Sequence, residues 1–143
     1  MFDGTYDAAQ VNVIVEGIPL SGMADGTFVT VDMDSDAFTK YKGTDGHASR
    51  SKSNDFCGTI TVTLAQSSPS NDILSALAQR DRLSNTGVVP VLVQDLSGTS
   101  VYASAFAWVR KKAKGEFGKE IGPREWVFDA VDLDMHNGGT LSI

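Results

Sequence analysis

An acidic run, Asp32-Met33-Asp34-Ser35-Asp36, is the part of this sequence whose residue types and spacing come nearest to a chemical site. Alternating carboxylates of this kind open the calcium-binding loop of an EF-hand. That loop also needs a glycine at its sixth position and a bidentate glutamate at its twelfth, where this chain has Ala37 and Gly43. The spacing therefore favours a solvated acidic turn, and we predict no metal site.

The two histidines and the single cysteine are the remaining candidates for catalysis. His47 lies in a polar stretch and His136 beside a turn, and neither has a catalytic motif around it. Cys57 follows Phe56, which is typical of a small core residue. The sequence has no phosphate-binding G-x-x-x-x-G-K-[ST], no H-E-x-x-H and no paired cysteines. We predict no catalytic, cofactor-binding or metal-binding residues, and we interpret both histidines as loop or contact residues of a protein that is not an enzyme.

Charge is distributed unevenly along the chain, whose formal net charge is −6. Residues 1–39 contain seven acidic residues and no Lys or Arg, whereas residues 110–124 contain six basic residues and two acidic ones. The acidic balance argues against tight binding to nucleic acid, although it is compatible with a surface past which DNA slides. Opposite poles on one small domain suit head-to-tail association of copies.

The stretch from Asp55 to Ser84 holds the clearest strand and the one convincing helix. From Gly58 to Leu64, Ile60, Val62 and Leu64 alternate with Thr59, Thr61 and Thr63, which predicts a strand covered on one face. Ser68 is a good N-cap, and Pro69 suits a first helical position. An apolar stripe of Ile73, Leu74, Leu77 and Ala78 then predicts a flanking helix over about residues 69–82.

Everything else in the sequence favours β-structure, with strands predicted near residues 9–20, 27–33, 37–42, 88–95, 101–109 and 125–134. Pro90 predicts an edge position for its strand, or a missing N–H turned away from a neighbour. Alternating alanines at 103, 105 and 107 predict a face packed closely against another element. Residues 1–8 are expected to form an N-terminal arm, and residues 43–54 a long polar loop of the kind that is usually functional.

Length and hydropathy predict one domain over residues 1–143. No apolar run approaches the roughly 18 residues of a membrane span, and the first residues do not resemble a secretory signal. We therefore expect a soluble protein made in a cytoplasm, without a membrane partner. The single cysteine allows no disulfide within the chain.

In the order in which they occur, these features resemble the tail-tube proteins of contractile-tailed bacteriophages, particularly a family of small myophage structural proteins. The resemblance covers nearly the whole chain. It depends on Ala37-Phe38-Thr39-Lys40, the loop Gly43 to Ser51, the run Asp55 to Leu64, the helix start Gln66-Ser67-Ser68-Pro69-Ser70-Asn71, the hairpin Asp95-Leu96-Ser97-Gly98, and Phe117-Gly118-Lys119-Glu120 followed by Trp126.

The resemblance implies a two-sheet β-barrel or sandwich with one flanking helix. It implies that six copies form a ring, that inner strands join into one channel, and that rings stack head to tail into a conduit for genome ejection inside a contractile sheath. Partners would be further copies of the chain and the sheath, baseplate and tail-terminator proteins, while DNA would pass without specific binding. The place of action would be the tail of the virion. Bacteriocin particles and type VI secretion systems contain related tubes.

We expect contacts between subunits or rings at the charged ends of the chain and at the polar loop. The candidate residues are Asp3, Asp7, Lys40, Lys42, Asp45, His47, Arg50, Lys52, Lys111, Lys112, Lys114 and Lys119. Thr59, Thr61 and Thr63 are candidates for the channel wall, which we expect to be polar and acidic because basic side chains would bind passing phosphates. A different class of function stays open at this point, namely a monomeric β-barrel that binds a small ligand between its sheets.

Overall fold

The computed structural model describes residues 1–141, so residues 142 and 143 of the predicted domain lie outside the described part. One α-helix, α1 (Ser70–Ser84), and a short 3-10 turn, η1 (Ala8–Gln10), accompany the strands. The strands are β1 (Val11–Val15), β2 (Ile18–Pro19), β3 (Val29–Met33), β4 (Phe38–Lys42), β5 (Ala48–Lys52), β6 (Gly58–Ala65), β7 (Val89–Asp95), β8 (Val101–Lys111), β9 (Pro123–Val131) and β10 (Asp134–His136).

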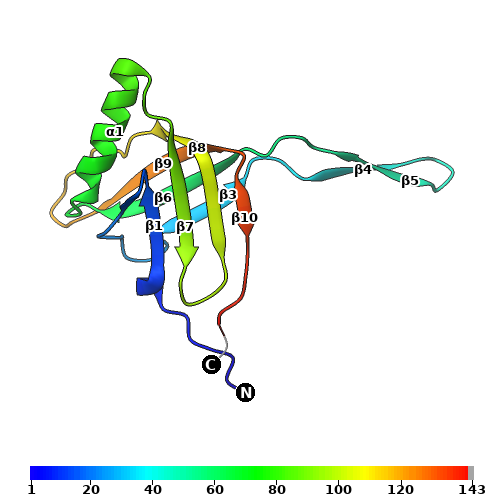
Figure 1. The fold of residues 1–143 in the computed structure, drawn as a ribbon, viewed down its shortest axis with the longest axis horizontal. Coiled ribbons are helices and arrows are strands. Elements are labelled where there is room, and N and C mark those ends of the chain that lie inside the picture. Colours follow the sequence, from blue (N-terminus) through cyan, green and yellow to red (C-terminus); the bar gives the residue numbers. More distant parts are fainter. Residues whose placement is uncertain (142–143) are drawn as a thin grey trace.

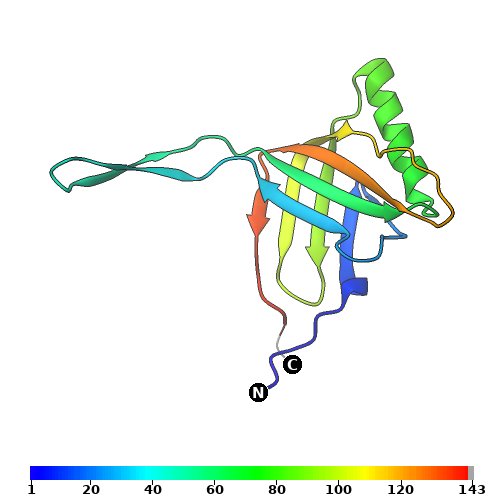
Figure 2. The ribbon, with the colours of Figure 1, turned by 180° about the vertical axis from the view of Figure 1, so that it is seen from behind.

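Eight strands form one antiparallel sheet in the order β2-β1-β7-β8-β9-β6-β3, and β10 also pairs with β8. Strand β8 connects two layers, because its first residues pair with β7 and β10 and its last residues pair with β9. In Figure 1 β1, β7 and β8 form one layer. In Figure 2, which is seen from behind, β3, β6 and β9 cross in front of that layer. The predicted mainly-β fold with one helix is confirmed, but the sheet does not close into a barrel within the described residues.

The core lies between these two layers. Strand β6 buries every second residue, as its alternation predicts, and Ile60, Val62 and Leu64 are fully buried. Valines of β1 and β7 meet them from the other layer, and Phe128 of β9 is the largest fully buried side chain. The three threonines of β6 therefore face outward from the sandwich.

Helix α1 begins close to its predicted start and extends to Ser84. Ser68 Oγ accepts a hydrogen bond from the Ser70 N–H (3.2 Å), so it caps the helix although Pro69 is the flanking residue. Asn71 anchors this end: its Nδ2 donates to the carbonyl of Ala65 (2.9 Å), and its Oδ1 accepts from Trp126 Nε1 (3.0 Å). The helix start is thereby tied to both β6 and β9.

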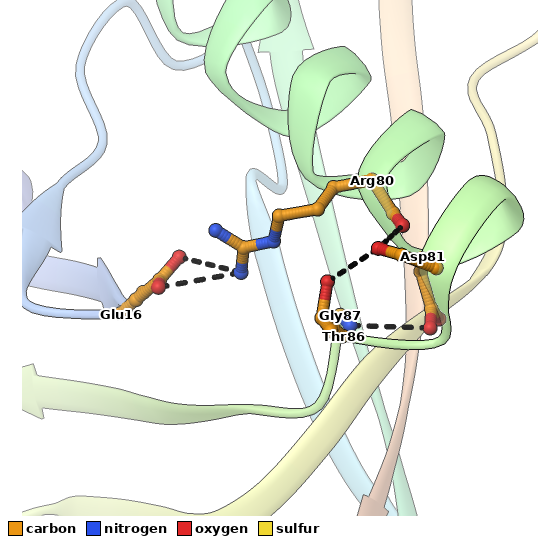
Figure 3. Close-up of polar contacts among 6 residues, drawn as sticks. Glu16, Arg80, Asp81, Thr86 and Gly87 are labelled. Carbon is orange, nitrogen blue, oxygen red and sulfur yellow. Dashed lines mark hydrogen bonds and ion pairs between the residues drawn. The ribbon is translucent and has the colours of Figure 1, made fainter.

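Figure 3 shows how the other end of α1 is held. Asn85 ends the helix in the left-handed conformation (φ 57°), and Asp81 Oδ1 accepts from the N–H of Gly87 (3.1 Å). Arg80 Nη2 forms an ion pair with Glu16 Oε2 (3.1 Å). Glu16 and Gly17 have positive φ and connect β1 to β2 as a two-residue hairpin turn, so the strand predicted over residues 9–20 is divided in two.

Strand β7 corrects two expectations. Of the two alternatives predicted for Pro90, the edge position is wrong, because β7 lies between β1 and β8. The register shifts between Val89 and Val91, so Pro90 lies opposite a bulge in β8. The shift also breaks the alternation of β8. Ala105 is exposed while Ser104 and Ala107 are buried, so the predicted alanine face is wrong.

The segment predicted as a long polar loop, residues 43–54, contains a strand. Residues Ala48–Lys52 form β5 and pair with β4, leaving a short turn between Lys42 and Ala48. The resulting hairpin projects from the end of the sandwich opposite α1 (Figures 1 and 2). Residues 37–53 are called the arm below, and residues 1–8, which were predicted as an N-terminal arm, are called the N-terminal segment. Its length is roughly 20 Å, at about 3.3 Å per residue of strand.

Candidate assembly surfaces

The arm has one basic face and one neutral face. Side chains of directly paired residues share a face of an antiparallel hairpin. The pairs Phe38–Lys52, Lys40–Arg50 and Lys42–Ala48 therefore lie on one face, and Thr39–Ser51 and Tyr41–Ser49 lie on the other. All ten strand residues are exposed. All four cations of the two strands thus point to the same side of the arm.

No acidic side chain balances this basic face among the described residues. Lys40 lies directly opposite Arg50, and such a like-charge pair is unfavourable. Aromatic rings offset part of the cost, since the Arg50 guanidinium lies 3.9 Å from the centre of the Phe38 ring and Lys52 Nζ lies 6.0 Å from that of Phe56. Asp45 and His47 lie at the tip, with 3.9 Å between His47 Nε2 and Asp45 Oδ2. The basic face is open to an acidic partner.

Asp55 forms hydrogen bonds at the base of the arm, and no pattern in the sequence indicates this role. Ser35, before β4, donates through Oγ to Asp55 Oδ2 (2.7 Å), and Asp55 Oδ1 accepts from the N–H of Cys57 (3.1 Å). The hydrogen bond from Ser35, followed by that from Cys57, lowers the pKa of the Asp55 carboxyl. Ser53 N also donates to the carbonyl of Ala37 (2.8 Å). These contacts join both legs and set the direction of the arm.

The acidic N-terminal segment lies apart from the arm. Asp7 Oδ1 caps η1 by accepting from the N–H of Ala9 (2.9 Å), and Asp3 is exposed. In Figure 1 the N-terminus lies below the sheet while the arm extends to the side. Within one chain the structure therefore does not bring Asp3 and Asp7 to the basic face.

The long connection from β8 to β9 forms a second basic surface. Lys111, Lys112 and Lys114 come together around a surface pocket of about 450 Å³, which is also lined by Thr63, Arg110, Glu116, Pro123, Glu125 and Val127. Two cations there have partners: Arg110 Nη1 lies 3.3 Å from Asp129 Oδ1, and Lys114 Nζ lies 3.7 Å from Glu116 Oε2. Lys119 lies in the same connection but outside the pocket lining.

The outer face of β6 is the candidate channel wall. Thr59, Thr61 and Thr63 are half-buried on this face. The register places Thr30 and Asp32 of β3 on one side of them, and Glu125 and Asp129 of β9 on the other. Thr59 Oγ1 also donates to Asp34 Oδ1 (3.0 Å). The face is polar and carries acidic side chains beside Thr59, but its Thr63 end borders the pocket lined by Arg110, Lys111, Lys112 and Lys114. That this face lines a channel stays a prediction.

The residues considered for chemistry are not gathered into one site. His47 lies at the tip of the arm and His136 in β10. Desolvation, with a smaller contribution from Asp55, raises the pKa of the Cys57 thiol, which disfavours the reactive thiolate. Across residues 1–141, no three His, Cys, Asp or Glu side chains are placed to hold a metal ion. In that same part of the chain, no helix has the length and apolarity needed to cross a membrane.

The space between the two layers is small. Its opening near β3 is a pocket of about 200 Å³ lined by Val11, Val29, Val31, Val93, Asp95, Ser100 and Tyr102. Pockets that enclose small ligands usually have about 300–1,000 Å³. This opening between the layers thus offers little room for the ligand that the alternative hypothesis places there.

Comparisons with known proteins agree on one kind of relative. The model of the family described as the bacteriophage PhiTE tail tube protein matches residues 10–138. "Structural protein ORF10" of Pseudomonas phage KPP10 is 32% identical over 147 residues, covering 97% of this chain and 85% of that protein.

Solved structures share the fold at low identity. The sheath/tube terminator of an extracellular contractile injection system, PVC, has a TM-score of 0.67 at 12% identity and covers 96% of this chain and 100% of that one. The tube-terminating cap of the anti-feeding prophage has a TM-score of 0.66 at 8% identity, with coverages of 95% and 93%. A chain of the PVC sheath–tube complex has a TM-score of 0.62 at 12% identity, with coverages of 92% and 91%.

Proposed function

The chain belongs to the family of the bacteriophage PhiTE tail tube protein, and we propose that its copies form hexameric rings that stack head to tail into the hollow tube of a contractile phage tail. The tube would guide the genome during ejection. Its place would be the virion tail, after synthesis in the host cytoplasm. The family is one of structural tail proteins, and the proposal assigns the chain no catalytic role.

The observation that carries this proposal is the arm. An isolated two-stranded hairpin is marginally stable in water, and this one has no core of its own, because every strand residue is exposed. Its four cations share one face, whereas the first 39 residues carry seven acids and no basic residue. Within one chain Asp3 and Asp7 do not reach this basic face. When copies associate head to tail, the basic face of one copy can contact the acidic residues of the next. Heterologous contacts of this kind generate rings or filaments.

The contact residues fall into three groups in this proposal. Lys40, Lys42, Arg50 and Lys52, with Asp45 and His47 at the tip, contact the acidic surface of a neighbouring copy; Asp3 and Asp7 belong to that acidic surface; and Lys111, Lys112, Lys114 and Lys119 form a further contact. Each exposed ion pair contributes only about 0.2–1 kcal/mol. Because every copy of a ring makes the same contacts, their sum decides whether rings stack.

Thr59, Thr61 and Thr63 line the channel in this arrangement. Neutral hydroxyls and Asp32 at the Thr59 end would offer passing phosphates few cations to bind, whereas the Thr63 end lies beside the cluster of Arg110 and three lysines. Sheath, baseplate and tail-terminator proteins are the further partners. The fold shared with the PVC sheath–tube complex and with two terminators supports a contractile particle rather than a flexible tail.

Light scattering and negative-stain microscopy of the purified full chain test the proposal. Rings or long tubes are expected, and their amount is expected to rise with protein concentration. A monomer that persists at all concentrations, and that binds a small apolar ligand, would favour the alternative of a ligand-binding β-sandwich. Packaged DNA in particles that contain the protein would distinguish a phage tail from a bacteriocin or type VI secretion tube.

A further inference from the structure

Arg124 is a half-buried residue with one buried guanidinium nitrogen that lacks a hydrogen-bond partner among residues 1–141. It is the second residue of β9 and pairs with Leu64, on the side of the strand from which Trp126 and Phe128 enter the core. Its Nη1 is buried and, within residues 1–141, has no hydrogen-bond partner. Leaving a buried charged donor unsatisfied is unfavourable, and such groups in native proteins call for an explanation.

The surroundings of Arg124 form a site open to the outside. Arg124 lines a cavity of about 240 Å³ together with Glu116, Phe117, Gly118, Glu120, Gly122 and Pro123. The Phe117 ring lies 5.3 Å from the guanidinium carbon of Arg124, so the charge is held against an aromatic face. Two acids line the cavity, but Glu116 pairs with Lys114 and neither forms an ion pair with Arg124.

The segment over this cavity has the properties of a docking surface. Residues 112–122 form neither helix nor strand. Phe117 and Ile121 are 84% and 70% exposed, which places two large apolar side chains at the rim. Lys111, Lys112 and Lys114 line the pocket on the other side of Glu116 and Pro123 and give the region a positive potential.

We propose that Arg124 and this lysine cluster form a carboxylate-binding site, and that a second copy of the chain fills it with an acidic side chain from its residues 1–39. A guanidinium is the side-chain group that binds a carboxylate through parallel hydrogen bonds. Of the seven acids in that segment, Glu16 pairs with Arg80 of its own chain, whereas Asp3, Asp7, Asp25, Asp32, Asp34 and Asp36 are exposed. This inference depends on the proposed assembly of copies and names one of its contacts.

Arg124→Met separates this role from a purely structural one. Methionine keeps part of the side-chain volume and removes the unsatisfied charge, so the melting temperature of the isolated subunit is expected to stay the same or rise. The protein concentration at which rings or tubes appear is expected to increase about tenfold or more, because the carboxylate of the partner loses its charge-assisted hydrogen bonds. Arg124→Lys keeps the charge but lacks the planar guanidinium. The concentration at which it assembles is expected to lie between those of the wild type and Arg124→Met.

The matched control is Arg82→Met, which removes an exposed arginine near the end of α1 and is expected to leave the assembly threshold unchanged. An unchanged threshold for Arg124→Met would overturn the inference. If wild-type protein forms no rings or tubes, the proposed assembly itself fails, and this inference fails with it. Assembly of the wild type with normal assembly of Arg124→Met would contradict only the site.

Zero-length cross-linking of wild-type assemblies gives a second test that needs no variant. A carbodiimide joins lysine amines to carboxylates in direct contact, and a mixture of isotopically light and heavy copies identifies the links between chains. We expect mixed-isotope links from Lys111, Lys112 or Lys114 to acids of residues 1–39 in assembled material, and none in dissociated subunits. Links between chains that join these lysines only to acids beyond residue 39 would overturn the inference.

Discussion

At the scale of single residues, Asn71 does more for the fold than its exposed helical position in the sequence suggests. Its amide donates to the end of β6 and accepts from the buried Trp126 indole. Asn71→Ala leaves that indole N–H without its partner, and we expect the free energy of unfolding to fall by about 1–3 kcal/mol. Urea denaturation measures this loss. Asn54→Ala, at an exposed position, is the control and should change stability by less than about 0.5 kcal/mol.

Cys57 offers a second residue-scale prediction, which concerns pH. Desolvation, followed by Asp55, raises the pKa of the thiol, so the thiolate forms at higher pH than in free cysteine. Alkylation of Cys57 by iodoacetamide should be slower than that of free cysteine at pH 8 and should accelerate as the pH rises further. Asp55→Asn removes a negative neighbour and should shift the rate profile toward lower pH. Alkylation at the free-cysteine rate would show that the thiol is not desolvated.

At the scale of elements, the two faces of the arm allow a test with matched charge changes. Replacing Arg50 and Lys52 together with glutamine removes two positive charges from the basic face. Replacing Ser49 and Ser51 together with glutamate lowers the net charge by the same amount on the neutral face. We expect the first variant to stay folded and form rings without long tubes, and the second to keep forming tubes. Microscopy measures the tube lengths of the two variants. Equal lengths would show that the two faces of the arm contribute equally to assembly.

Removing the arm as a whole is the stronger version of the same experiment. The Ser53 N–H donates to the Ala37 carbonyl, so the legs are adjacent at the root and residues 38–52 can be replaced by a short glycine turn. The sandwich does not include β4 or β5, and its melting temperature should therefore change little. Charge reversal by Arg50→Glu and Lys52→Glu should also abolish long tubes. Long tubes from the armless variant would remove the arm from the assembly contact.

The sequence predicts those elements whose signal is local. Strand β6 shows its alternation because one face is buried, and α1 shows a stripe and a capping serine at its start. Strand β5 is not predicted from the sequence, because its residues pack against no core and show no apolar alternation. Its structure depends on pairing with β4. The bulge in β8 lies opposite Pro90 of the neighbouring strand, and the residue pattern of β8 does not indicate it.

The same division applies to the candidate assembly surfaces. Charge clusters are visible in the sequence, and Lys111, Lys112 and Lys114 do surround one pocket. The sharing of one face by four cations of the arm follows only from the register of β4 and β5. The hydrogen bond between Ser35 and Asp55 joins residues whose spacing in the sequence gives no sign of a contact. Nor does the sequence show that Nη1 of Arg124 is buried without a partner among the described residues.

At the scale of the whole molecule, the channel wall can be tested through the charge that it presents to DNA. If the outer face of β6 lines the channel, Thr61→Lys adds a cation in every copy of every ring, half-buried among Thr30 and Val127 of the neighbouring strands. Bound counterions are released from DNA when such cations contact phosphates, so DNA should move through the tube more slowly. Particles carrying Thr61→Lys should form normally but eject a smaller fraction of their DNA.

Salt dependence separates this effect from a general defect of the tail. Phosphate binding weakens as salt concentration rises, so ejection by Thr61→Lys particles should recover toward wild type in high salt. Thr61→Gln is the control, since it adds bulk without charge and should eject normally at every salt concentration. Thr39→Lys adds the same charge on the exposed arm, away from the proposed wall, and should not slow the ejection of DNA. Normal ejection by Thr61→Lys in low salt would place the outer face of β6 away from the channel.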